Sequence, residues 1–102
     1  MFLKEREMKI KVTGYLTFRK LIREQPFIQL GENGTVKDLL DRLSLEYGDA
    51  FTNLVFDPDT KKVSRSIAIL VNGRHYSHLP SRLNTELKEG DEVAIFPPVA
   101  GG

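Results

Sequence analysis

The alternation of hydrophobic and polar residues along 8–12 predicts a β-strand with one face buried. A second short apolar stretch, at 27–30, predicts another strand. We expect the two strands to pair as an antiparallel hairpin, with a long loop around 14–24 as their connection. Residues 1–7 are expected to form a frayed lead-in, and Met8 is a candidate natural start.

A helix is predicted to follow Thr35, because Asp38 stands three residues later in the arrangement of a capping box. Apolar residues then recur at helical spacing and form a stripe that can pack on a sheet. The stripe consists of Val36, Leu39, Leu40, Leu43 and Tyr47. Gly48 is placed to end this helix in the left-handed conformation. A shorter helical turn at 50–56 and a polar turn at 57–60 are expected next.

The second half of the chain predicts three more strands. The nearly continuous apolar run 66–71 is typical of a central strand buried on both faces. Asn72-Gly73 is a strong hairpin signal, and it should return the chain through a short strand at 75–77. The last strand is expected at 92–96, because Pro97-Pro98 cannot donate to a sheet ladder. Together these elements predict an α+β domain, with four to five strands packed on one main helix.

Length, charge and apolar content argue against several classes of protein. The 102 residues suit a single domain, 1–102. Fifteen Lys and Arg against fourteen Asp and Glu give a net charge of +1, which argues against a dedicated nucleic-acid binder. No apolar run approaches the roughly 20 residues that cross a bilayer, and 1–7 lacks the apolar stretch of a signal peptide. We expect a cytoplasmic protein that binds neither membrane nor nucleic acid.

The side chains offer little catalytic chemistry. Cysteine is absent, which excludes disulfides, thiolate-bound metals and a cysteine nucleophile. His75 and His78 are the only imidazoles and are expected on the surface of a hairpin, so no metal site is predicted. No nucleophile–base pair is evident. The chain is therefore not expected to be catalytic alone.

The segment after the last strand is the candidate for chemistry. It consists of Pro97, Pro98, Val99, Ala100, Gly101 and Gly102, and we expect 97–102 to protrude as a tail. The prolines favour an extended path, and glycines can enter a channel too narrow for a side chain. ATP could adenylate the Gly102 carboxylate, and a sulfur nucleophile could then convert it to a thiocarboxylate. The plainer alternative is a frayed chain end.

The run 90–102, read with the order of the elements, resembles the MoaD family, the small subunit of molybdopterin synthase. The resemblance covers about 8–102 and implies a β-grasp (ubiquitin-like) fold with a mixed sheet. It implies a sulfur carrier whose thiocarboxylate donates sulfur to cyclic pyranopterin monophosphate in molybdenum or tungsten cofactor synthesis. The implied partners are a MoaE-like large subunit, a MoeB-like adenylating enzyme and a sulfurtransferase. ATP would be used by the adenylating enzyme, with no cofactor bound permanently.

The resemblance also implies roles for particular residues. Gly102 would carry the thiocarboxylate, while Val99, Ala100 and Gly101 would thread the partner's channel. The implied partner-binding residues are Phe96, Pro97, Pro98, Tyr15 and Arg19. For Phe96 and Tyr15 the sequence leaves open whether each ring is exposed or simply packed.

The sequence leaves other functions open. Residues around 49–62 are extra relative to the shortest bacterial members and occur also in archaeal ubiquitin-like small modifiers. Such a modifier would be joined through Gly102 to lysines of target proteins. A carrier for thiamine thiazole synthesis is disfavoured because those carriers usually lack the diproline. A plain interaction module with an idle tail is the remaining alternative.

Overall fold

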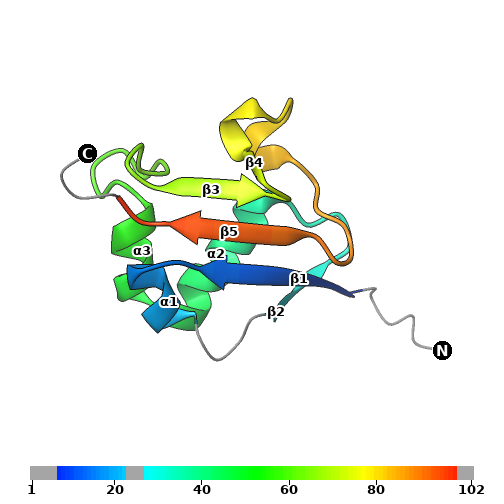
Figure 1. Ribbon diagram of the computed structural model, residues 1–102, viewed down its shortest axis with the longest axis horizontal. Helices are drawn as coiled ribbons and strands as arrows, with labels where there is room; N and C mark the ends of the chain where they lie inside the picture. Colours follow the sequence, from blue (N-terminus) through cyan, green and yellow to red (C-terminus); the bar gives the residue numbers. More distant parts are fainter. Residues whose placement is uncertain (1–6, 23–26, 99–102) are drawn as a thin grey trace.

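The computed structural model describes residues 7–22 and 27–98, which form a mixed five-stranded sheet covered by helices (Figure 1). The strands are β1 (Glu7–Gly14), β2 (Phe27–Gly31), β3 (Ala68–Val71), β4 (Arg74–His75) and β5 (Glu92–Phe96). Their order across the sheet is β2-β1-β5-β3-β4. The β1–β5 pair is parallel, and the other neighbours are antiparallel. The predicted α+β fold and mixed sheet are confirmed.

The helices lie on one face of the sheet and leave the other face open (Figure 1). They are α1 (Thr17–Leu21), α2 (Val36–Tyr47) and α3 (Asp49–Val55), followed by two short 3₁₀ helices, η1 (Tyr76–His78) and η2 (Arg82–Asn84). The core lies between the sheet and α2, whose predicted apolar stripe supplies four fully buried side chains. These are Val36, Leu39, Leu40 and Leu43. Burial of this stripe fixes the helix against the sheet.

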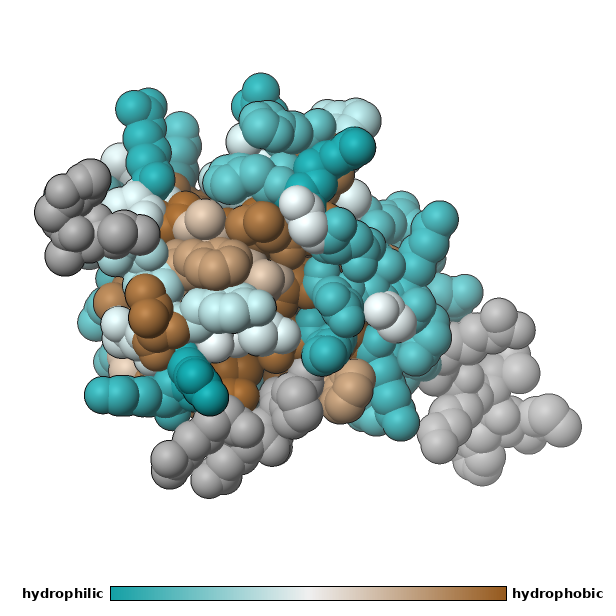
Figure 2. Space-filling model, viewed as in Figure 1, coloured by the Kyte–Doolittle hydropathy of each residue, from teal (hydrophilic) through white to brown (hydrophobic). Residues whose placement is uncertain are grey.

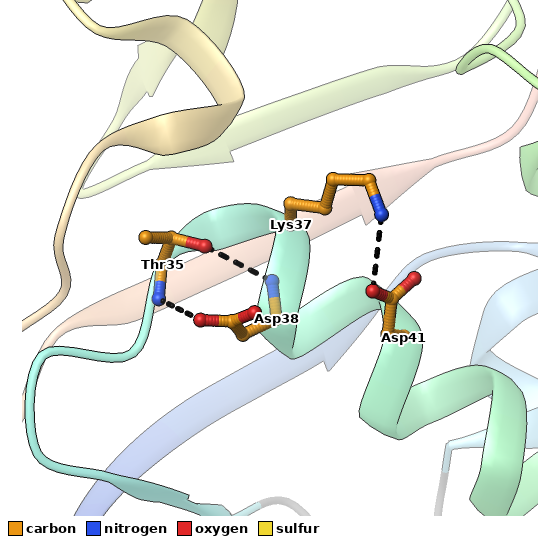
Figure 3. Close-up of polar contacts among 4 residues, drawn as sticks. All are labelled: Thr35, Lys37, Asp38 and Asp41. Atoms are coloured by element: carbon orange, nitrogen blue, oxygen red, sulfur yellow. Dashed lines mark hydrogen bonds and ion pairs between the residues drawn. The ribbon is translucent and has the colours of Figure 1, made fainter.

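The start of α2 is the predicted capping box (Figure 3). The Asp38 N–H donates to Thr35 Oγ1 at 3.1 Å, and the Thr35 N–H donates to Asp38 Oδ2 at 2.9 Å. One turn on, Lys37 and Asp41 form an ion pair with Nζ and Oδ2 3.1 Å apart. Two of the N–H groups that a helix start leaves unpaired are thus satisfied by side chains.

Three expectations about local structure need correction. The connection 14–24 is not only a loop, because it contains α1, which buries Phe18. Gly48 ends α2 with φ 72° and ψ −154°, so it has positive φ but lies outside the left-handed helical region. The same residue begins α3, which runs from Asp49 rather than from Ala50. One glycine therefore joins two helices without a loop between them.

The segment 66–71 also differs from its prediction. The strand begins at Ala68, and its side chains alternate between half-buried and buried. Ile69 and Val71 face the helices, whereas Ala68 and Leu70 lie on the open face. The apolar run is continuous because both faces are apolar, although helices cover only one of them.

The remaining strand predictions are largely confirmed. Asn72 and Gly73 both have positive φ, 51° and 86°, as a tight two-residue hairpin requires. The return strand at 75–77 is instead the two-residue β4, because η1 begins at Tyr76. β5 has the predicted bounds, while β1 already includes Glu7. Within the described part of the chain, no helix has the length and apolar content to cross a membrane.

Candidate functional site

The end of β5 is held by hydrogen-bonded neighbours on both sides. Phe96 pairs with Ala68 of β3, and Ile95 pairs with Gly14 at the end of β1. Just beyond β1, the N–H of Tyr15 donates to the carbonyl oxygen of Ile95 at 3.0 Å. The ladder therefore continues to the last residue of the strand, which fixes where the chain leaves the sheet.

Two aromatic rings are stacked at this point. The rings of Tyr15 and Phe96 are nearly parallel, with an interplanar angle of 3° and centroids 4.3 Å apart. The side chain of Tyr15 is 42% exposed, and Phe96 is half-buried beneath it. Ile95 faces the core, so Phe96 points to the open face. Of the alternatives left by the sequence, both rings belong to the surface rather than to the core.

The stacked pair extends into an apolar patch on the open face, which we call the apolar platform. It consists of Tyr15, Ala68, Leu70, Ala94 and Phe96. Figure 2 shows hydrophobic colours gathered on the half of this face toward the end of β5, with hydrophilic colours over the other half. On that polar half, Lys11 and Glu92 form an ion pair with Nζ and Oε2 3.7 Å apart. Exposed aromatic rings in an apolar patch with a polar surround are typical of a protein-binding surface.

The remaining predicted site residues differ in exposure, and some of them lie outside the described part of the chain. Pro97 is buried and Pro98 is exposed, so of these two rings only that of Pro98 is open to a partner. Arg19 is exposed in the last turn of α1, and within 7–22 and 27–98 it makes no ion pair. Val99, Ala100, Gly101 and Gly102 lie outside the described residues, so their roles stay predictions.

The other chemistry-bearing side chains have local roles. His75 Nδ1 lies 2.8 Å from Ser77 Oγ and accepts the Ser77 N–H at 3.1 Å, which caps η1. The imidazole of His75 also stacks on Tyr76. In the part of the chain that the structure describes, no three His, Cys, Asp or Glu side chains gather into a potential metal site. The features that stand out among the described residues are therefore the aromatic stack at the end of β5 and the apolar patch around it.

The sequence did not identify the aliphatic members of the platform. Ala68, Leu70 and Ala94 carry no chemistry of their own, and the run 66–71 suggested burial on both faces. A signal was present nonetheless. Ala94 and Phe96 share one face of β5 and are both apolar, whereas the outward positions of an exposed strand are usually polar.

Comparison with known proteins identifies the family of this chain. The family model of ThiS matches residues 15–102, from the exposed tyrosine to the final glycine. The chain belongs to the ThiS family. The predicted resemblance to MoaD- and ThiS-like, ubiquitin-like sulfur carriers is therefore confirmed at the level of the family.

Relatives of this ThiS family chain include small archaeal modifiers. It is 33% identical to small archaeal modifier protein 3 of Haloferax volcanii over 96 residues, 93% of this chain and 100% of the relative. The solution structure of small archaeal modifier protein 1 from Methanosarcina acetivorans is 31% identical, with a TM-score of 0.76, and the match covers 95% and 99% of the two chains. A candidate molybdopterin converting factor subunit 1 from Pyrococcus furiosus is 32% identical, with a TM-score of 0.65 and coverage of 90% and 99%.

Proposed function

We propose that this protein is a ubiquitin-like modifier whose Gly102 carboxylate is activated by a partner enzyme and joined to lysine side chains of target proteins. The observation that carries the proposal is its similarity to small archaeal modifier protein 3, at 33% identity over 93% of this chain and the whole of the relative. The apolar platform beside the end of β5 supports it. An activating enzyme must hold the globular part while the last residues reach its nucleotide.

The chemistry needs only a carboxylate from this chain. A carboxylate oxygen of Gly102 attacks the α-phosphorus of ATP, and pyrophosphate leaves to give an acyl adenylate. The amine of a target lysine then attacks the carbonyl carbon, AMP leaves and the nitrogen loses a proton, so an isopeptide bond forms. Glycines without a β-carbon suit a narrow passage to both reactions.

The platform gives the activating enzyme a docking surface. Phe96 and Tyr15 present aromatic area of the kind that dominates protein interfaces. Because Phe96 is the last residue of β5, a partner that covers the stack also receives the chain as it leaves the sheet. Pro98 and Arg19, which are both exposed, would supply further contacts with the partner.

A second function is favoured by the similarity to the candidate molybdopterin converting factor subunit 1 of Pyrococcus furiosus. Here a persulfide on a sulfurtransferase attacks the same adenylate, AMP leaves and an acyl disulfide forms. A thiol then cleaves the sulfur–sulfur bond and leaves a thiocarboxylate on Gly102. A MoaE-like subunit would take the tail and pass this sulfur to cyclic pyranopterin monophosphate.

One experiment tests both functions. Tagged protein is recovered from its own cells, and its intact mass first establishes that the chain ends at Gly102. Trypsin cuts after Lys88, so a conjugated lysine should carry the branch Glu89–Gly102. Sulfur loading should appear as the exchange of one oxygen for one sulfur at the terminus.

The matched control is a chain that lacks Gly102, in which both products should disappear while the fold is retained. Branched peptides support the modifier, and the thiocarboxylate alone supports the sulfur donor. Recovery of neither product, from cells in which the chain does end at Gly102, would overturn both.

A further inference from the structure

A cleft at the β3–β4 edge of the sheet is separate from the apolar platform. One wall is a tight hairpin at 56–63, in which Phe56 bridges Val63 and the N–H groups of Asp57 and Lys61 donate to the carbonyl oxygens of Lys62 and Asp57, both at 2.8 Å. The other wall is 76–84, which contains η1 and η2. The cleft has a volume of about 830 Å³, which falls within the range of ligand-binding sites.

The charged side chains that line this cleft are all cations. Its lining includes five cations and no carboxylate: Lys37, Lys61, Lys62, Arg65 and Arg82. That is a third of the fifteen Lys and Arg in a chain whose net charge is only +1. Lys37 is paired with Asp41, but among the described residues the other four make no ion pair. Such a concentration creates a local positive field that the overall charge conceals.

The same cleft has an apolar floor. Phe56, Val63, Tyr76 and Leu83 line it and are half-buried, so each leaves apolar area open to a ligand. An apolar floor inside a cationic rim suits a ligand with one large apolar group and several negative charges. Burial of the apolar group would supply affinity, and the charges would supply orientation and association rate.

Two of the cations stand on strained backbone. Lys61 has φ 64° and Arg82 has φ 48°, and these residues come from opposite walls. Such a conformation in a non-glycine residue costs free energy and is found preferentially at binding and catalytic sites.

We infer that the cleft between 56–63 and 76–84 is a second, non-covalent binding site, which takes an acidic segment of a partner protein that carries one large apolar side chain. The charge complementarity and the apolar floor favour a peptide over a nucleic acid. A nucleic acid needs a basic path along its backbone, whereas these cations line one short cleft with an apolar floor. The site uses none of the residues proposed for activation at Gly102.

The test uses the full chain and a fluorescein-labelled peptide of six glutamates around one phenylalanine. Two control peptides replace the glutamates with glutamine or the phenylalanine with alanine. Fluorescence anisotropy should show binding of the first peptide, weakened at least about tenfold in either control and weakened by added salt. Backbone amide NMR shifts should concentrate around Phe56, Val63 and Leu83.

A matched pair of charge reversals locates the site. Lys61→Glu with Arg82→Glu should weaken binding at least about tenfold, whereas Lys9→Glu with Lys20→Glu changes the net charge equally and should weaken it less than about twofold. Lys9 and Lys20 are exposed and lie outside the cleft. Lys61→Gln with Arg82→Gln should give an intermediate loss, and circular dichroism confirms that each variant folds.

Three results would overturn the inference. They are equal weakening by both reversals, absence of peptide binding at millimolar concentration, and tighter binding of a labelled single-stranded oligouridylate that the cleft reversal abolishes. The last result would assign the cleft to nucleic acid instead.

Discussion

The ring of Tyr15 lies flat on the ring of Phe96, with 4.3 Å between their centroids. The first residue beyond β1 is thereby coupled to the last residue of β5, across a parallel strand pair. A backbone hydrogen bond from Tyr15 to Ile95 supports the same junction. A partner that covers the tyrosine ring therefore lies beside the last residue of β5.

Replacement of Tyr15 by alanine should separate recognition from folding. The ring is 42% exposed, so its loss should cost only about 1 kcal/mol of unfolding free energy, the usual value of an aromatic pair. Adenylation by the cognate activating enzyme should fall much more, through a higher KM for the carrier. Urea titration and pyrophosphate release measure the two effects. Leu45→Ala, at an 84% exposed position of α2, is the control and should leave adenylation unchanged. Normal adenylation by the Tyr15 variant would contradict the platform's role.

The stack itself can be measured by a double-mutant cycle. Tyr15→Ala and Phe96→Ala should be less than additive in unfolding free energy, with a coupling of about 0.5–1.5 kcal/mol. The rings touch each other, so the second truncation finds part of its interaction already lost. Strict additivity, measured by urea unfolding at one temperature, would mean that the contact contributes nothing to the native state.

We expect that Gly14 is indispensable for the junction between the ends of β1 and β5. A β-carbon there would lie 2.6 Å from the carbonyl oxygen of Phe18, which is backbone and cannot rotate away. Gly14→Ala should therefore displace α1, cost about 1–3 kcal/mol and reduce adenylation. Gly73→Ala is the matched control, because its φ of 86° strains the backbone but nothing lies within 4 Å. It should lose stability and keep adenylation, and a Gly14 variant that behaves the same way would refute this distinction.

The sequence predicted those elements whose signals are local. The capping box at Thr35, the Asn72-Gly73 turn and the bounds of β5 each follow from residues within a few positions of one another. The short helix α1 lacks such a signal, because its N-cap is Leu16 with φ 54° and no side-chain capping bond. Packing of Phe18 into the core holds that helix, and packing is a tertiary effect.

The functional site likewise contains residues that the sequence identified and contacts that it could not predict. Tyr15 and Phe96 were identified from a family resemblance, but their contact depends on a parallel pairing of strands that are distant in sequence. The cationic cleft could not be assembled from the sequence either, since its members come from α2, the segment 56–65 and the segment 76–84. As separate charges in a sequence, they resemble an ordinary solvated surface.

The capping box offers a graded test of α2. Thr35→Ala removes the hydroxyl that accepts the Asp38 N–H, and it should cost about 1 kcal/mol. Thr35→Ser keeps an oxygen in the same place and should cost much less. Thermal unfolding followed by circular dichroism compares the two variants. Equal losses would show that the methyl group, rather than the hydrogen bond, matters at this position.

Asn72 should tie the β3–β4 turn to the start of β5. Its side-chain oxygen accepts the Glu92 N–H at 3.0 Å, and its amide donates to Asp91 Oδ1 at 3.1 Å. Asn72→Gly keeps the φ of 51° accessible but loses both hydrogen bonds, and it should lower the unfolding free energy by about 1 kcal/mol. Asn72→Ala loses the same bonds and adds backbone strain, so it should lower the unfolding free energy further.

Asn72→Asp separates the two bonds. A carboxylate can still accept from Glu92, but it would face Asp91 across the distance that now holds a hydrogen bond. We expect a larger loss than for glycine at low salt, partly recovered at high salt because screening weakens the repulsion. Urea unfolding at two ionic strengths measures this difference. An aspartate variant as stable as the wild type at low salt would show that the contact with Asp91 contributes little to the junction.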